Sequence, residues 1–269
     1  MMLQPPSVFD PTQTVIWGGN LPSTRRALVS GFTGLVVALG GNLGGSTSKL
    51  LSFDGGAAAG RLRLDVIYPV LGLKRCVDYQ QGFEFTFPSS WLADQTLLYR
   101  AAQRGEQERS SQMRPIVAPS ALSAQRAEER MQKRGVEPVA AFGPAGSSGE
   151  KNVSVIAAPI YKGFTIQSLG GPQQSAKRFL ASIAPPESGR TAVLIEASER
   201  QDALGTVYYD MEYTLEGPRF FRHNISSYAS RDDILFTLNA QCPESSWGED
   251  SEDLRKAAAS FKLFPSSSS

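Results

Sequence analysis

Histidine and cysteine are scarce in this chain of 269 residues. The sequence holds one histidine, His223, and two cysteines, Cys76 and Cys242. A zinc site normally takes several ligands from these two residue types, so the sequence argues against zinc. No cofactor is predicted, although carboxylates are plentiful and weak binding of calcium or manganese through oxygen ligands stays open.

The two cysteines stand far apart in the sequence and show no spacing typical of a metal site. A disulfide between Cys76 and Cys242 requires a fold that brings them together and an oxidising compartment. Two separate, half-buried thiols are the alternative. The sequence alone leaves both interpretations open.

An excess of charge of one sign is also lacking, because 27 Lys and Arg residues stand against 26 Asp and Glu residues. That balance predicts no nucleic-acid partner. The exception is a stretch from Arg104 to Gly135, in which seven Lys or Arg residues stand against four Glu residues. We expect these basic side chains to bind a partner, with a solvated loop as the alternative. They are Arg104, Arg109, Arg114, Arg126, Arg130, Lys133 and Arg134.

Acidic residues are rare at the front of the chain, where residues 1–60 hold only two of them. The twin arginines Arg25 and Arg26 precede an uncharged, modestly apolar stretch, which is typical of a twin-arginine export signal. A retained segment is the alternative, because apolar residues recur at helical spacing and would anchor a helix at a membrane. These residues are Phe32, Leu35, Val36 and Leu39.

Alternation of apolar and polar residues predicts a sheet in the rest of the chain. Phe83, Phe85 and Phe87 place three rings on one face of a strand, and a second strand is expected over residues 96–101. Three alternating runs between residues 206 and 241 are separated by tight turns, which predicts an antiparallel meander.

Two amphipathic helices are expected beside this sheet, at residues 172–183 and 249–261. The predicted fold class is therefore α+β, an α/β/α sandwich with a central, mostly antiparallel sheet flanked by helices. We expect a front segment, residues 1–60, and one domain, residues 61–265, which carries an insert at residues 104–150.

Five segments resemble the PsbP family and follow one another in the order found there. The first is Gly82–Trp91, in which an aromatic strand ends in proline and is followed by tryptophan. The others are Asn152–Val155, Gly171–Pro172 before Phe179–Leu180, Leu235–Glu244, and Trp247 with Phe261. The resemblance covers the chain from Arg75 to Leu263, with an interruption at the insert.

The resemblance implies the PsbP fold and a non-catalytic accessory or assembly role at photosystem II or photosystem I. It further implies a location in the chloroplast thylakoid lumen, peripheral on the membrane surface, reached by twin-arginine export. A structural lumenal subunit of the chloroplast NDH complex is the alternative.

An uncharacterised hydrolase is a remote alternative, because no nucleophile, base or metal cluster stands out in the sequence. His223 and Ser226 lie three residues apart in an expected strand, so their side chains point to opposite faces and cannot form a dyad. We expect His223 to be a structural or surface residue.

Overall fold

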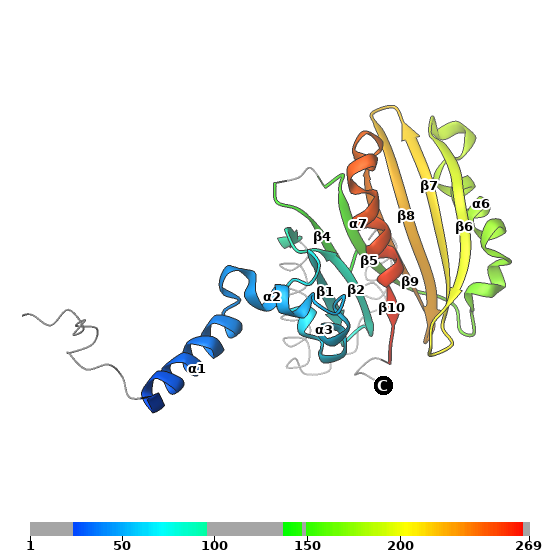
Figure 1. Ribbon diagram of the computed structural model, residues 1–269. Coiled ribbons are helices and arrows are strands. Elements are labelled where there is room, and N and C mark those ends of the chain that lie inside the picture. Colours follow the sequence, from blue (N-terminus) through cyan, green and yellow to red (C-terminus); the bar gives the residue numbers. More distant parts are fainter. Residues whose placement is uncertain (1–23, 96–136, 147–148, 266–269) are drawn as a thin grey trace, which may run out of the picture.

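Seven antiparallel strands form the large sheet, in the order β3-β4-β5-β9-β8-β7-β6 (Figure 1). The computed structural model describes residues 24–95, 137–146 and 149–265. The strands are β3 (Trp91–Ala93), β4 (Ala140–Pro144), β5 (Asn152–Pro159), β6 (Thr191–Gln201), β7 (Val207–Gly217), β8 (Phe220–Arg231) and β9 (Ile234–Pro243). The long strands β7, β8 and β9 are the meander that the alternation predicts.

A second, three-stranded sheet has the order β1-β2-β10 and consists of β1 (Leu73–Asp78), β2 (Phe83–Pro88) and β10 (Lys262–Leu263). The three predicted rings of β2 are buried, with Phe83 and Phe85 almost fully inaccessible. They pack with Phe236 and Leu238 of β9 in the main core. The aromatic strand thus belongs to a small sheet that covers the large one, a separation that the sequence did not reveal.

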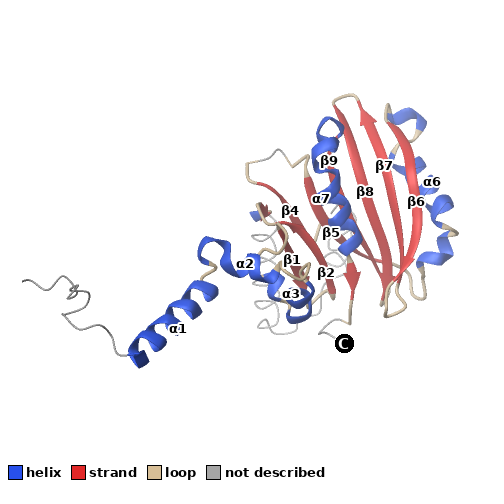
Figure 2. Cartoon of the chain, viewed as in Figure 1, coloured by secondary structure: helices blue, strands red, loops and turns tan. Residues whose placement is uncertain are grey.

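Two helices lie on opposite faces of the large sheet, and Figure 2 shows α7 in front and α6 at the far edge. Helix α6 (Pro172–Ile183) buries Ala176 and Leu180 against Met211 and Tyr213 of β7. Helix α7 (Trp247–Ser260) packs on the other face, where side chains alternate with those facing α6. The predicted α/β/α sandwich is confirmed.

The front segment continues past residue 60 to Leu71, just before β1, and forms three helices, α1 (Thr24–Gly40), α2 (Ser46–Leu51) and α3 (Ala57–Leu62). Short 3₁₀ turns follow at Leu43–Gly45 and Leu64–Val66, and three others lie in the domain at Ile166–Leu169, Pro186–Ser188 and Glu244–Ser246. Among the described residues, no helix is long and apolar enough to cross a membrane.

Polar side chains define the turns between the front helices. The Asn42 carboxamide accepts a hydrogen bond from the Ser48 backbone N–H and donates one to its hydroxyl, both at 3.0 Å. The Asp54 carboxylate accepts from the backbone N–H groups of Gly56 (3.0 Å) and Ala58 (2.7 Å), at the start of α3. These bonds satisfy backbone groups that a helix end otherwise leaves unpaired.

The strand expected at residues 96–101 and the basic stretch from Arg104 to Gly135 lie outside the described residues. Cys76 and Cys242 are both free thiols in the structure, which favours two separate thiols over a disulfide. Cys76 lies on β1, an outer strand of the small sheet, and Cys242 lies buried on β9 of the large sheet.

Candidate docking surface

The front segment exposes an unusual amount of apolar surface. Eleven of the nineteen large apolar side chains that are exposed among the described residues lie between Phe32 and Leu71. They are Phe32, Leu35, Val36, Val37, Leu43, Leu50, Phe53, Leu62, Val66, Ile67 and Leu71, and we call them the front surface. Exposed apolar side chains gathered in one region are typical of an interaction site.

A shallow groove lies within the front surface. Its volume is about 370 Å³, and its lining is mostly apolar and includes Phe53, Pro69 and Leu71. Phe53 is 93% exposed, although phenylalanine is the kind of side chain that a fold normally buries. The exposed Lys49 lies at the same groove, which gives it one positive charge.

Helix α1 projects away from the domain (Figure 1), and two hydrogen bonds hold its C-terminal end. There the Tyr68 hydroxyl donates a hydrogen bond to the Gly40 carbonyl at 2.8 Å, and the Thr47 hydroxyl donates to the Leu39 carbonyl. Leu39 is half-buried, whereas Phe32, Leu35 and Val36 are 69%, 54% and 53% exposed. The predicted anchor residues therefore lie on one helix, and three of the four face solvent.

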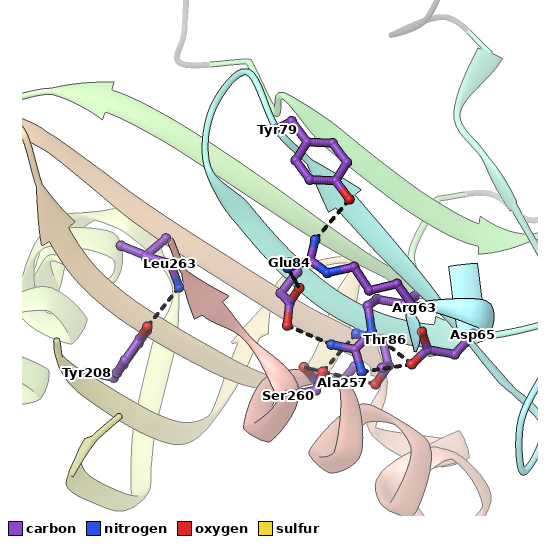
Figure 3. A network of polar contacts seen from close by, with 10 residues as sticks. Arg63, Asp65, Tyr79, Glu84, Thr86, Tyr208, Ala257, Ser260 and Leu263 are labelled. Carbon is purple, nitrogen blue, oxygen red and sulfur yellow. Dashed lines mark hydrogen bonds and ion pairs between the residues drawn. The ribbon is translucent and has the colours of Figure 1, made fainter. Parts of the chain in front are cut away.

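An ionic clamp joins the front segment to the small sheet (Figure 3). The Arg75 guanidinium on β1 donates to the Asp65 carboxylate at 2.7 and 2.8 Å and to the Glu84 carboxylate at 2.6 Å. Asp65 belongs to the 3₁₀ turn Leu64–Val66, and Glu84 belongs to β2. Arg75 thus links the last turn of the front segment to two strands of the domain.

The charges of the clamp compensate one another. Burial by itself lowers the pKa of Arg75, but the hydrogen bonds and the negative charges of Asp65 and Glu84 outweigh burial and raise it. The guanidinium therefore stays charged between the two carboxylates, with two of its nitrogens on one oxygen of Asp65 and the third on one oxygen of Glu84. Arg63 adds a longer ion pair with Glu84 at 3.7 Å and a hydrogen bond to the Tyr79 hydroxyl at 3.0 Å.

The sequence did not predict this clamp, because alternation places Glu84 and Thr86 on the face of β2 opposite the rings. Glu84 is nevertheless only 8% exposed, since the front segment lies against that face. Thr86 is bound from the other end of the chain, where the Ser260 hydroxyl accepts from its backbone N–H at 2.8 Å. Both faces of β2 are therefore covered.

His223 lies in a second polar cluster, beneath the start of α7. Its ring stacks on Trp247 with centroids 3.5 Å apart and is 3% exposed. Nδ1 lies 2.8 Å from Glu244 and Nε2 lies 3.0 Å from Glu212, which also accepts from Arg255 at 2.8 Å. The cluster ties β7 and β8 to α7, which confirms a structural histidine.

This cluster shifts the ionisation of one carboxyl. Burial favours the neutral form of Glu212, but hydrogen bonds and charges from Arg255 and His223 outweigh burial and lower its pKa below the ordinary 4.5.

No group of three or more metal-ligating side chains is arranged around an ion site in the described part of the chain. The prediction of no cofactor, with weak calcium or manganese binding left open, is not tested by this finding.

The predicted site residues fall into separate regions. Arg25 and Arg26 lie in the first turn of α1. The seven basic residues of the insert, from Arg104 to Arg134, lie outside the described residues, and their role in partner binding stays a prediction. No sequence pattern marked Phe53, Lys49 or Leu71, because the groove arises only when α2 folds back toward the turn at Pro69.

Comparison with known proteins decides the family. A family model described as PsbP matches residues 71–263. The chain belongs to the PsbP family. It is 41% identical over 244 residues to "PsbP domain-containing protein 7, chloroplastic" of Arabidopsis thaliana, an alignment that covers 89% of this chain and 82% of that protein.

More distant PsbP relatives match a smaller part. CyanoP of Thermosynechococcus vestitus is 32% identical over 120 residues, which cover 42% of this chain and 65% of CyanoP. The solution structure of CyanoP from Synechocystis aligns over 72% of this chain and 94% of its own, with a TM-score of 0.48 and 22% identity.

Proposed function

We propose that this PsbP-family chain is a non-catalytic accessory or assembly subunit of a photosynthetic membrane complex, photosystem II or photosystem I. It acts in the chloroplast thylakoid lumen and lies peripherally on the membrane. The Arabidopsis relative, 82% of whose length is matched, is named as chloroplastic. That name supports the proposed compartment. The wider family supports the accessory role.

The front surface is the observation that carries the docking role. A domain that acts alone gains nothing from eleven exposed apolar side chains on a segment outside its core, whereas a subunit of an assembly buries them. The clamp of Arg75, Asp65 and Glu84 holds this segment on the domain, so that both reach the partner together. The basic insert adds charge-steered contact to acidic lumenal surfaces.

Co-migration with a complex tests the proposal. A tagged chain in thylakoids, solubilised in mild detergent and separated on a native gel, should run with photosystem II or photosystem I, as read by mass spectrometry of the band. Co-migration with the NDH complex would favour the structural-subunit alternative. If the chain runs only as free protein on the native gel, even after cross-linking that preserves weak complexes, the docking role is refuted.

The insert is tested by removing its charge without changing its length. Replacement of its seven basic residues, Arg104 to Arg134, by Gln should leave the melting temperature unchanged and weaken binding to the complex at low salt more than at high salt. The matched control is Lys162→Gln with Lys177→Gln, two exposed cations outside the insert. Equal binding and equal salt dependence of the Gln variant and this control would identify the insert as a solvated loop.

A further inference from the structure

Strand β6 is an open edge of the large sheet. It pairs with β7 on one side, and no described strand lies on its other side (Figure 2). Edge strands present unpaired backbone N–H and C=O groups, which proteins usually protect with charges, bulges or a cover. The first part of β6, Thr191–Ile195, carries no charge, and the bulge and the charged residues Glu196, Glu199 and Arg200 come at its end or after it. The first part therefore lacks the protection that the second part has.

Backbone groups along β6 alternate between β7 and the open side. At the turn that follows β6, the Asp202 N–H donates to the Thr206 carbonyl at 3.1 Å, so every second residue back to Glu196 bonds to β7. Ala197 lies between the bonded positions and points outward. Its carbonyl accordingly accepts from the Gln173 side chain of α6 at 2.9 Å, which caps this point of the edge.

Ala192 and Leu194 point outward in the same way as Ala197. All three side chains pack toward α6, and residues of one strand that share a face also direct their backbone groups to the same side. The N–H and C=O groups of Ala192 and Leu194 therefore face away from β7. No described residue binds these four groups, so they can pair with one short added strand.

A pocket lies next to these backbone groups, between α6 and β6. Its volume is about 320 Å³, and its mostly apolar walls come from both elements, namely Leu180, Ala181, Ala184, Ala192 and Leu194. A strand added to β6 directs every second side chain to the face that α6 covers. The pocket can therefore receive an apolar side chain of that strand.

The surroundings of the pocket define the chemistry of the added strand further. On the face away from α6, Val193 is 54% exposed, so it favours an apolar neighbour across the strands. On the α6 face, the exposed Lys177 lines the pocket and makes no ion pair with a described residue. Helix α6 has no acidic residue, and the exposed Arg190 directly precedes β6. The groove is therefore positive and favours a segment with an acidic side chain.

We propose that β6 binds an extended segment of a partner protein as an added strand, with an apolar side chain in the pocket beside α6 and an acidic side chain near Lys177. This inference deepens the proposed function and rests on it only for which complex supplies the segment. A second copy of the chain fits less well. An antiparallel pairing of two copies around Val193 places both α6 helices on one face and brings two Lys177 ammonium groups to the same groove.

Peptide selection tests the site directly. The full chain is immobilised, and a displayed library of random ten-residue peptides is selected against it. We expect enriched peptides to carry adjacent apolar residues next to an acidic one. The strongest peptide is synthesised, and its affinity is measured by fluorescence anisotropy.

Backbone pairing is tested on the unmodified chain with two further versions of this peptide. One version carries N-methyl groups on its odd residues and the other on its even residues. One of them should bind at least about tenfold more weakly and the other almost normally, because only one edge of an added strand faces β6.

Variants of the chain locate the site. Ala192→Pro removes one outward N–H without touching the bonds to β7, and it should weaken peptide binding at least about fivefold. The matched control is Glu199→Pro, since Glu199 also points outward but lies beyond the Ala197 carbonyl that Gln173 caps. It should bind the peptide like the unmodified chain. Lys177→Gln should remove only the preference for the acidic side chain over its amide. Circular dichroism should show the same fold in all variants.

A library without a binding peptide, equal binding of the two methylated versions, or normal binding by a folded Ala192→Pro variant overturns the inference. Concentration-dependent dimers that Ala192→Pro abolishes, in place of peptide binding, would assign the edge to a second copy. The two proposals fail separately. Peptide binding without co-migration would refute only the role at the complex, whereas normal co-migration of Ala192→Pro would refute only the docking through β6.

Discussion

Large apolar side chains are mostly buried in the domain and mostly exposed in the front segment. In the domain, two sheets and two helices enclose a core that includes Phe83, Phe85, Phe236, Leu254 and Phe261, each at most 1% exposed. In the front segment, Ala59 is the one apolar residue before Val70 that is fully buried among the described side chains. Both regions contain apolar residues, but only the domain has layers between which to place them.

The difference arises from element length and regularity. Strands β6 to β9 have ten to twelve residues each, so their alternating side chains form two continuous faces. Helices α2 and α3 have six residues each and are separated by glycine-rich turns, so neither presents a face wide enough to build a core. We infer that burial of apolar side chains stabilises the domain. The front segment is stabilised by hydrogen bonds, by ion pairs and by contacts with its partner.

The largest effect is expected from Phe85→Ala in the domain. The ring is 1% exposed and packs edge-on against Phe142 at 5.8 Å, so its loss should lower the free energy of unfolding by about 3–5 kcal/mol. Chemical denaturation measures the change. Leu204→Ala, at an exposed site, should change stability by no more than about 0.5 kcal/mol. If Phe85→Ala and Leu204→Ala lowered the free energy of unfolding equally, the assignment of Phe85 to the core would be wrong.

A smaller, local effect is expected from Arg75→Met at the junction of the two regions. The substitution leaves Asp65 buried without its cation and leaves Glu84 only the longer ion pair with Arg63, and we expect a loss of roughly 1–3 kcal/mol because the cluster is partly solvated. Native-state hydrogen exchange should show faster exchange in α2 and α3 and little change in β8 and β9. Arg75→Lys, which keeps the charge but not the fork, should lie between the two. Uniform loss of protection would show that the regions unfold as one unit.

The pH dependence of the domain should be weaker in Glu212→Gln. A carboxyl whose pKa is lowered in the folded state stabilises the fold above its unfolded pKa and loses that contribution as the pH falls through the folded value. The melting temperature of the unmodified chain should therefore fall on acidification below 4.5, and less steeply in the variant. The control is Glu252→Gln, because Glu252 also has a lowered pKa but pairs with Lys256 at a 79% exposed position. Identical slopes in Glu212→Gln and the unmodified chain would contradict the assignment.

The smallest effect concerns the thiols. Burial and the nearby Asp78 raise the pKa of Cys76 to about 12, and burial also raises the pKa of Cys242. The thiolate is the reactive form, so a thiol reagent should label neither residue in the native chain and both after denaturation. A reductant should leave the melting temperature unchanged. A drop in melting temperature on reduction would indicate a disulfide after all.

The sequence predicted the parts of the fold that depend on local periodicity. The alternation of residues 206–241 and the stripe of Ala176 and Leu180 fixed the meander, helix α6 and its buried side. The small sheet could not be predicted, because its pairing of β2 with the two-residue strand β10 depends on contacts between distant residues. The partners of Glu84 could not be predicted for the same reason. Its burial depends on contacts with the front segment, and the alternation within β2 carries no information about them.

The pairing of β2 with the end of the domain delays the completion of the core during synthesis. Thr86 and its partner Ser260 are separated by 174 residues, which take on the order of ten to thirty seconds to synthesise. Until α7 and β10 have been made, the rings of Phe83 and Phe85 lack the side chains of Leu254, Phe261 and Leu263 that enclose them. Until then the nascent chain carries this aromatic strand without that part of its cover, so we expect β2 to be a segment that a chaperone protects during translation.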